Sequence, residues 1–385
     1  MQTEGDDKMP QLEDAKPARI LLVISSLECG GAERVMTDMA NHWSRMGREI
    51  VLVTWSGPDV PDFYALDPAV TRIFLNVESP NTSAIGKLRS HFSRIRQLRN
   101  CLSERSPHVV LSFIDWSNVL TILAAFRKPA RVVVSERIHP AHNNTLATSW
   151  KILRKAVYRM ADTVVSQTKE SSNWVRRHCG VAACTIPNPL RDLPSAEAER
   201  EQLILGIGRL RRQKGFDLLI RAFASIHNEF NGWRVMIVGR GMEEQKLIDL
   251  RDELGLTEKV EIVSPVRNIE DLMARASLVV QPSRFEGFPN VVLEAMGMGA
   301  AVVSADCPSG PAEIINDGEN GCLVPVDDRE ALARKMAELL RNPSLRQSIA
   351  GRAVDVRTTY GQERIMRLWE DCLFPDSRTA TVGLE

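Results

Sequence analysis

Several features that mark whole classes of proteins are missing from this sequence of 385 residues. Charge of one sign is not in excess, because 49 basic residues balance 49 acidic ones, whereas a general nucleic-acid binder is usually basic. No apolar run reaches the roughly 18 residues of a transmembrane helix. The amino terminus, M-Q-T-E-G-D-D-K, is polar and acidic, unlike a signal peptide. We therefore expect a cytoplasmic protein that does not bind nucleic acid.

Signatures of bound metals and dinucleotides are missing as well. The seven cysteines, at positions 29, 101, 179, 184, 307, 322 and 372, form no C-x2-C pair, which argues against a zinc site. Their odd, scattered count fits reduced thiols in the cytosol. The dinucleotide fingerprint G-x-G-x-x-G is absent, which disfavours a nucleotide-dependent oxidoreductase. We expect neither a metal ion nor a cofactor.

The composition is that of a globular protein, with 44% hydrophobic and 25% charged residues. The length predicts two domains. Apolar runs at 19–25, 109–113 and 131–135 are typical of strands buried on both faces of a parallel sheet. The first run leads through a glycine turn and a helical pattern to the strand expected at 49–55. This order predicts a right-handed crossover unit.

The stretch 284–295, R-F-E-G-F-P-N-V-V-L-E-A, connects an expected strand (278–281) to a helix that starts near Val291. Glu286 lies in the loop and Glu294 about one turn into the helix. The N–H groups of a helix start favour a phosphate, and carboxylates accept hydrogen bonds from sugar hydroxyls. The pattern predicts a nucleotide-sugar pocket. The alternative is a surface loop with two solvated glutamates.

Two further loops follow expected strands. Gly30 and Gly31 stand where a ligand could approach the main chain, or where a tight turn needs a positive φ. Arg209 and Lys214, in G-R-L-R-R-Q-K-G, could neutralise a diphosphate without a metal ion, because arginine offers a planar fork and lysine a mobile charge. A basic surface turn is the alternative reading of the second loop.

The segment 136–142, E-R-I-H-P-A-H, places titratable groups at the end of another expected strand. Glu136, Arg137 and His139 are rival candidates for a catalytic role there. The alternative for His139 is a histidine on a surface loop.

Residues 85–99, I-G-K-L-R-S-H-F-S-R-I-R-Q-L-R, carry five positive charges with no acidic residue and predict a basic amphipathic helix. Such a helix can lie on an anionic membrane surface. The alternative is a helix packed on the core with a solvated basic face. A second basic stretch, 150–159, points to the membrane more weakly.

The stretch 284–295 resembles the E-x7-E signature of retaining glycosyltransferases of family 4, which have the GT-B fold. The resemblance continues through P-S-G-P-A-E-I-I (308–315), G-E-N-G-C-L-V-P (318–325), G-R-L-R-R-Q-K-G (208–215) and the N-terminal glycine loop, and so covers roughly 19–372. It implies an α/β fold of two Rossmann-like, doubly wound domains that face each other across a cleft. The absence of a D-x-D sequence agrees with a metal-independent enzyme of this kind.

The resemblance also implies roles for particular residues. Glu286 would orient the donor sugar and stabilise the oxocarbenium-like state, with His139 or Glu136 as rival catalytic groups on the acceptor side. Glu294 would hold the ribose, and Val266 and Arg267 would lie beside the base. The remaining expected substrate-binding residues, mainly around the diphosphate and the acceptor, are Gly30, Gly31, Arg137, Arg209, Lys214, Gly287, Phe288, Pro289, Asn290 and Val291.

The expected domains are an acceptor domain (18–190), a linker (191–202), a nucleotide-sugar domain (203–360) and a helix (361–374) that crosses back to the first domain. Residues 1–17 and 375–385 are expected to be disordered. The expected donor is a UDP-hexose or UDP-N-acetylhexosamine, and the expected acceptor is a polyprenyl-diphosphate glycan or a polysaccharide at the inner membrane face. The alternatives are a UDP-sugar epimerase or hydrolase of the same fold, and a degenerate protein that only binds nucleotide sugars.

Overall fold

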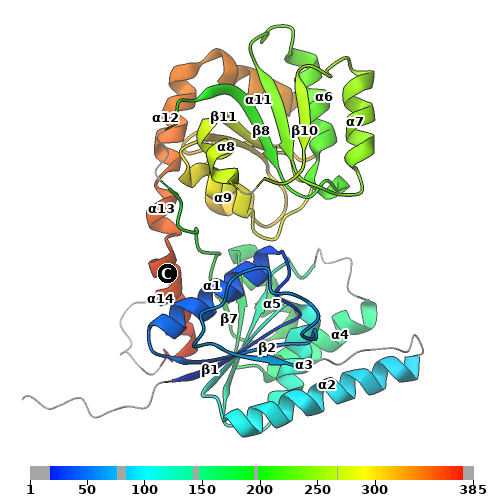
Figure 1. Ribbon diagram of the computed structural model, residues 1–385, viewed down its shortest axis with the longest axis vertical. Helices are drawn as coiled ribbons and strands as arrows, with labels where there is room; N and C mark the ends of the chain where they lie inside the picture. The colour runs from blue at the N-terminus through cyan, green and yellow to red at the C-terminus, as the bar shows by residue number, and fades with distance from the viewer. Residues whose placement is uncertain (1–17, 76–83, 142–146, 195–197, 267, 376–385) are drawn as a thin grey trace, which may run out of the picture. The chain divides into compact units, whose positions relative to one another are not determined.

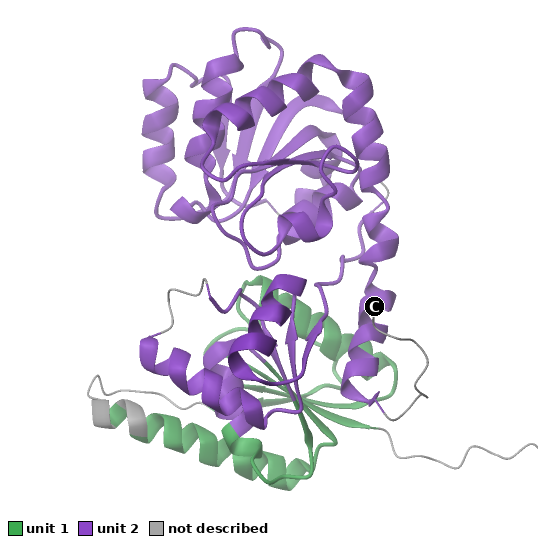
Figure 2. Cartoon of the chain, turned by 180° about the vertical axis from the view of Figure 1, so that it is seen from behind, with its two compact units in different colours: residues 1–112, 123–132 green, residues 113–122, 133–385 purple. Residues whose placement is uncertain are grey.

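The computed structural model describes residues 18–75, 84–141, 147–194, 198–266 and 268–375. Strands and helices alternate and build two parallel β-sheets (Figure 1). The chain divides into two compact units, residues 1–112 with 123–132 and residues 113–122 with 133–385 (Figure 2). The boundary between the two units separates strands of the first sheet, so it does not test the domain limits expected above, which stay a prediction.

The first sheet has seven strands in the order β3-β2-β1-β4-β5-β6-β7. The strands are β1 Arg19–Ile24, β2 Glu49–Thr54, β3 Thr71–Phe74, β4 Val109–Phe113, β5 Arg131–Glu136, β6 Thr163–Ser166 and β7 Ala183–Thr185. The helices between them are α1 Gly31–Arg45, α2 Ala84–Arg105, α3 Asp115–Ala125, α4 Thr148–Val157, η1 Tyr158–Met160 and α5 Lys169–Cys179. β1 pairs in parallel with both β2 and β4, so the strand order reverses between β1 and β4.

The second sheet has six strands in the order β10-β9-β8-β11-β12-β13. They are β8 Glu201–Ile207, β9 Arg234–Val238, β10 Val260–Val263, β11 Ala276–Gln281, β12 Ala301–Ala305 and β13 Cys322–Val324. The helices are η2 Arg212–Lys214, α6 Phe216–Ile226, α7 Glu244–Glu253, α8 Ile269–Arg275, α9 Asn290–Gly297, α10 Pro311–Ile314, α11 Arg329–Arg341, α12 Pro343–Ala353, α13 Val356–Thr359 and α14 Gln362–Leu373. The order reverses between β8 and β11, and α/β proteins place ligands beside the carboxyl ends of strands at such a point.

Alternate side chains of the central strands enter two different cores. In β8, Ile204 packs with residues of α6, α7 and α11, whereas Leu203 and Leu205 pack with residues of α8 and α9. Both faces of the sheet are therefore covered by helices, which is why its strands are continuous apolar runs.

Some elements differ from the sequence-based expectation. The sequence I-P-N-P-L at 186–190 predicts the end of the last strand and a hinge, but β7 already ends at Thr185, and Leu190 makes only an isolated bridge to Gly361. The sequence predicts one helix over 344–360, but the structure has two helices there, α12 and α13. The termini expected to be disordered lie outside the described residues, except for residue 375.

The carboxyl-terminal helix α14 is amphipathic and buries Trp369, whose ring centroid lies 6.0 Å from that of Phe113 at the end of β4. The main-chain N–H of Leu190 donates to the carbonyl of Tyr360, just before this helix. Within the described ranges, no helix combines the length and apolar character needed to cross a membrane.

Candidate active site

Glu286 lies in the loop between β11 and α9, and three donors converge on one of its carboxylate oxygens. Oε1 accepts hydrogen bonds from Ser283 Oγ at 2.6 Å, Lys214 Nζ at 2.6 Å and Gln281 Nε2 at 3.3 Å. The side chain is only 7% exposed. Oε1 is thus fixed in place, while Oε2 has no hydrogen-bond partner in the part of the chain that the structure describes.

Glycines allow the loops after β8 and β11 to approach closely enough for the Lys214–Glu286 pair. Gly215 has a φ of +68°, and a Cβ there would lie 2.0 Å from the carbonyl oxygen of Pro282. Gly208 has a φ of +155°, and a Cβ there would lie 3.1 Å from Cε of Lys214. Any other residue at these positions would be strained, and at position 215 its Cβ would collide with the main chain of the loop after β11.

Arg284 fastens the same two loops together. Its guanidinium donates to both carboxylate oxygens of Asp217, at 2.9 and 2.8 Å, to Asp327 at 2.7 Å and to the carbonyl of Arg212 at 2.6 Å. The hydrogen bond to Asp217 raises the pKa of Arg284 above its ordinary value. Arg284 belongs to the stretch 284–295, but its charge is paired with carboxylates of the protein itself.

Glu294 projects from the second turn of α9 and is nearly buried. Its Oε2 lies 3.3 Å from Nη2 of Arg191, which also donates to Glu270 of α8. The sequence did not indicate Arg191 as part of this site, because it stands in the expected linker with no motif around it. A ribose that bound Glu294 would therefore meet a carboxylate already paired with a cation.

The loop residues after Glu286 are packed rather than free. A Cβ on Gly287 would lie 2.6 Å from the carbonyl oxygen of Arg137, and Phe288 and Pro289 are buried. No side chain caps the start of α9. The N–H of Asn290 donates to the carbonyl of Phe288 at 3.0 Å, so of the two expected phosphate-binding N–H groups only that of Val291 remains a good candidate.

The other expected donor-binding residues are more open. Arg209 is exposed at the end of β8, and Val266 is exposed after β10. Arg267 lies outside the described residues.

Gly30 and Gly31 belong to the other compact unit, at the start of α1. Gly30 has an extended backbone with a φ of −167°, so the alternative of a turn that needs a positive φ is wrong for this glycine. Its carbonyl accepts hydrogen bonds from Arg34 N at 3.0 Å and from Tyr64 Oη at 3.3 Å.

Of the three rivals after β5, Glu136 is the most deeply buried, at 1% exposure. Its Oε1 accepts a hydrogen bond from Tyr158 Oη at 2.7 Å and lies 3.5 Å from Nη1 of Arg154. Burial, and secondly the neighbouring Asp115, raise the pKa of Glu136 well above its ordinary value. Such a group is placed to organise its surroundings rather than to touch a substrate.

Arg137 and His139 are also buried, but at the loop that follows. The guanidinium of Arg137 lies 4.3 Å from the ring centroid of Phe113 and donates to the side chain of Asn188. Nδ1 of His139 accepts a hydrogen bond from Ala141 N at 3.2 Å, and its Nε2 lies 3.7 Å from Oε1 of Glu170. The alternative of a surface histidine is therefore wrong, since His139 is only 3% exposed.

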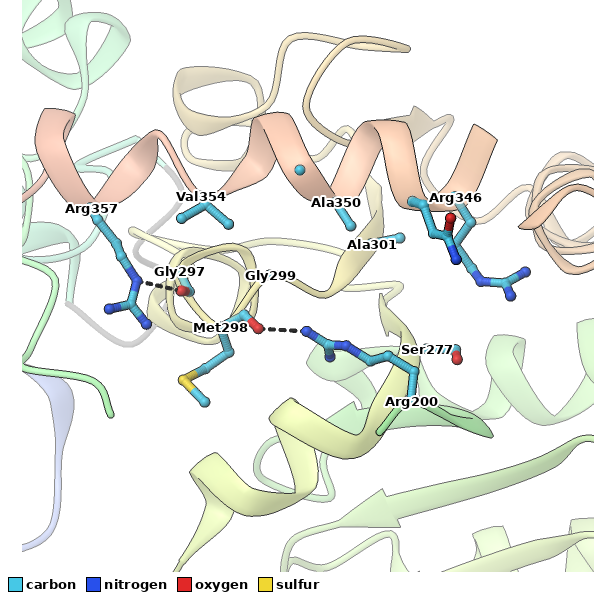
Figure 3. A pocket seen from close by; sticks show the side chains of 12 residues that line it. Arg200, Ser277, Gly297, Met298, Gly299, Ala301, Arg346, Ala350, Val354 and Arg357 are labelled. Atoms are coloured by element: carbon cyan, nitrogen blue, oxygen red, sulfur yellow. Dashed lines mark hydrogen bonds between the residues drawn. The ribbon is translucent and has the colours of Figure 1, made fainter. Parts of the chain in front are cut away.

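A pocket of about 570 Å³ lies elsewhere in the second unit and contains none of these residues (Figure 3). Its arginines hold main-chain carbonyls: Arg200 donates to Met298 and Arg357 donates to Gly297. No group of three or more His, Cys, Asp or Glu side chains is placed to hold a metal ion within the described ranges.

Two family models match consecutive parts of the chain and together cover residues 29–355. The family model described as Glycosyltransferase Family 4 matches residues 29–191, and the model described as Glycosyl transferases group 1 matches residues 192–355. The chain belongs to glycosyltransferase family 4. Its two Rossmann-like parallel sheets are those of the GT-B fold.

Individual relatives match at nearly full length. The chain is 26% identical over 367 residues to the amylovoran biosynthesis glycosyltransferase AmsD of Erwinia amylovora, which covers 92% of this chain and 99% of that protein. It is 27% identical to an α-1,4-N-acetyl-D-galactosaminyltransferase of Campylobacter jejuni whose name specifies an undecaprenyl-diphosphate-linked glycan, over 87% of this chain and 92% of that protein. The solved structure of Anabaena HepE in complex with UDP superimposes with a TM-score of 0.76 at 18% identity, over 93% of this chain and all of that one.

Proposed function

We propose that this family 4 enzyme is a retaining, metal-independent transferase that moves a hexose or N-acetylhexosamine from a UDP-sugar to a lipid-linked glycan or polysaccharide. The observation that carries the proposal is the environment of Glu286. Three donors hold Oε1, so Oε2 keeps a fixed direction in which it can accept a hydrogen bond from a sugar hydroxyl. A carboxylate oriented in this way can stabilise positive charge that develops on the sugar ring.

Departure of the diphosphate needs positive charge, and two cations on one loop can supply it. Lys214 has three N–H donors, so it can keep its bond to Glu286 and still donate to a phosphate oxygen. Arg209 is exposed on the same loop, and the uncapped start of α9 offers the N–H of Val291. In this scheme Glu294 and Arg191 bind the ribose of the donor. The departing phosphate takes the proton of the acceptor hydroxyl, which attacks the same face of the sugar ring that the phosphate leaves.

The choice of UDP is supported by the HepE structure, which holds UDP. A lipid-linked acceptor is supported by the Campylobacter relative, whose named substrate is linked to undecaprenyl diphosphate. His139, near Arg137 and the Glu286 loop, is our choice for the acceptor side over Glu136, because Glu136 is enclosed by Tyr158 and Arg154.

We further propose that the enzyme associates peripherally with the inner membrane face through α2. Phe92 in this helix is 73% exposed, and Arg89 and Arg96 on either side of it are also exposed. An exposed aromatic side chain among arginines is the arrangement that an anionic lipid surface attracts. The second basic stretch, in α4, exposes Ile152 and Leu153.

The deciding experiment measures UDP release from a panel of UDP-sugars, with and without a polyprenyl-diphosphate-sugar acceptor. Wild type, Glu286→Ala and the matched control Glu330→Ala are compared, since Glu330 is a solvated glutamate at the start of α11. We expect acceptor-dependent release with one donor, lost in Glu286→Ala and kept in Glu330→Ala. Release that needs no acceptor would favour an epimerase or hydrolase, and no release with any UDP-sugar would refute the donor assignment.

A further inference from the structure

Helix α4 packs on the rest of the protein with an unusual pair of buried side chains. Its buried side chains are Val157 and an arginine, Arg154, which is only 1% exposed, whereas the neighbouring Ile152 and Leu153 are exposed. A buried arginine normally has to be matched by hydrogen bonds and opposite charge, because removing it from water is costly. The groups that contact Arg154 therefore indicate its role in the protein.

Two of these partners are carboxylates at the ends of adjacent strands. Nη1 of Arg154 lies 3.5 Å from Oε1 of Glu136, at the end of β5, and 3.7 Å from Oδ1 of Asp115, after β4. The guanidinium carbon lies 5.3 Å from the ring centroid of Trp174 in α5. Contacts between ionisable groups that are buried in this way contribute little net stability, so their value lies more in the geometry that they impose.

The third partner is a peptide group. Nη2 of Arg154 donates to the carbonyl oxygen of Pro140 at 3.0 Å. The N–H of the same planar peptide, that of Ala141, donates to Nδ1 of His139 at 3.2 Å. One rigid group thus joins Arg154 to His139, and hydrogen bonds in series strengthen one another.

We infer that Arg154 is a positioning residue for the acceptor side of the reaction, because it fixes through the Pro140–Ala141 peptide both the orientation and the tautomer of His139. With Nδ1 acting as acceptor, the proton of the neutral imidazole is carried by Nε2, the nitrogen that lies 3.7 Å from Glu170 Oε1. The catalytic part of this inference rests on the proposed function, whereas the structural part concerns His139 alone.

The structural part is tested without turnover, by nitrogen-15 NMR of the histidine rings, with the His139 signal assigned from its loss in His139→Gln. We expect wild type to show the tautomer protonated at Nε2. Arg154→Met and Ala141→Pro, which remove the two ends of the relay, should each give a mixture of tautomers. Arg159→Lys is the control, because this exposed arginine of the next turn donates to the carbonyl of Cys179 instead.

The kinetic part uses the donor and acceptor that the UDP-release assay identifies. We expect Arg154→Met to lower kcat/KM for the acceptor about 10- to 100-fold with the KM for the donor unchanged, a loss comparable to that of one or two hydrogen bonds to a charged group. Arg154→Lys should be intermediate, and Arg159→Lys should equal wild type. Adding Arg154→Lys to Ala141→Pro should cause no further loss, because both act through one peptide.

Several results would overturn the inference. An unchanged His139 tautomer in both Arg154→Met and Ala141→Pro would refute the relay, whether or not the protein turns over any UDP-sugar. Equal loss of donor and acceptor kinetics with an unchanged tautomer would make Arg154 a merely structural residue. If Arg154→Met does not fold, the tautomer and the kinetics are compared in Arg154→Lys and Ala141→Pro instead. If the losses of kcat/KM in these two variants add up in the double variant, the relay is also refuted.

Discussion

At the scale of single residues, Ser283 is the simplest test of how Glu286 is held. Its hydroxyl donates to Oε1 at 2.6 Å, and the side chain is fully buried. A hydrogen bond to a charged group is worth about 1.5–3 kcal/mol, so Ser283→Ala should lower kcat roughly tenfold or more. The rate of UDP release at saturating substrates measures this loss, with a thermal melt to verify folding.

Ser225→Ala is the matched control for this prediction, since Ser225 in α6 donates only to the carbonyl of Ala222. It should keep the wild-type rate. Equal rates for the two serine variants would show that Glu286 does not depend on Ser283.

Glu136 gives a prediction on stability against pH. Burial and Asp115 raise the pKa of Glu136 well above its ordinary value, while Arg154 and Tyr158 oppose them. A carboxyl group with a raised pKa in the folded state contributes its full stability below the unfolded pKa of about 4.3, and loses it as the pH rises through the folded pKa. Glu136→Gln stays neutral, so its melting temperature relative to wild type should increase as the pH rises from about 4.5 to 7.5.

Thermal melts of both proteins across this range measure the effect. The solvated Glu330→Gln should keep a constant difference from wild type. A constant difference for Glu136→Gln as well would mean that Glu136 is ionised in the folded protein, paired with Arg154.

At the scale of elements, Arg284 shows how a motif residue can serve the fold. It joins the loop after β11 to Asp217 in α6 and to Asp327 before α11. Arg284→Met should lower the free energy of unfolding by about 1–3 kcal/mol, a range reduced because Asp217 and Asp327 are partly exposed. Because the loop carries Glu286, the KM for the donor should also rise.

Urea unfolding and donor kinetics measure the two effects. Arg341→Met removes a comparable arginine pair with Glu229 that is about half exposed on both sides, so it should change the free energy of unfolding much less than Arg284→Met and leave KM unchanged. If the two variants behave alike, the Arg284 contacts do not hold the loop.

The elements that the sequence predicted best are those whose pattern is local. The apolar run 109–113 is β4 with the same limits, because a strand buried on both faces needs apolar residues at every position. The short edge strands β3 and β13 were not expected, and β7 ends before the strand end expected at 186–190. They have three or four residues, several partly exposed, and exist because a neighbouring strand offers hydrogen bonds.

The sequence likewise indicated some residues of the candidate site and missed others. Glu286, Glu294 and Lys214 could be proposed from the sequence because they stand in short motifs beside expected strand ends, and the structure joins Lys214 to Glu286. Arg191 on Glu294 could not, because it is 103 residues away in sequence and pairs only through the fold. The same holds for Arg154, whose helix pattern indicated a basic face, while its contacts lie inside the protein.

At the scale of the whole molecule, the exposed side chains of α2 provide a test of the proposed association with a membrane surface. Not all of its basic side chains are open to solvent: Arg99 donates to the carbonyls of Ala124 and Phe126, and Arg94 is partly buried. Arg89 and Arg96 remain exposed near Phe92. The exposed basic surface of this helix is therefore smaller than its sequence indicates.

We expect wild type to sediment with vesicles that contain anionic lipid, and much less with neutral vesicles, in a salt-dependent manner. Arg96→Ser should weaken binding about fivefold, since one charge near the surface is worth roughly 1 kcal/mol, and Phe92→Ser about tenfold or more from lost apolar burial. Phe63→Ser is the control, because Phe63 is also well exposed, at 64%, but its neighbour in the sequence is Asp62 and not an arginine. Equal binding of Phe92→Ser and Phe63→Ser, or equal binding of wild type to neutral and anionic vesicles, would remove α2 as the membrane contact and leave the exposed edge of α4 to be tested in its place.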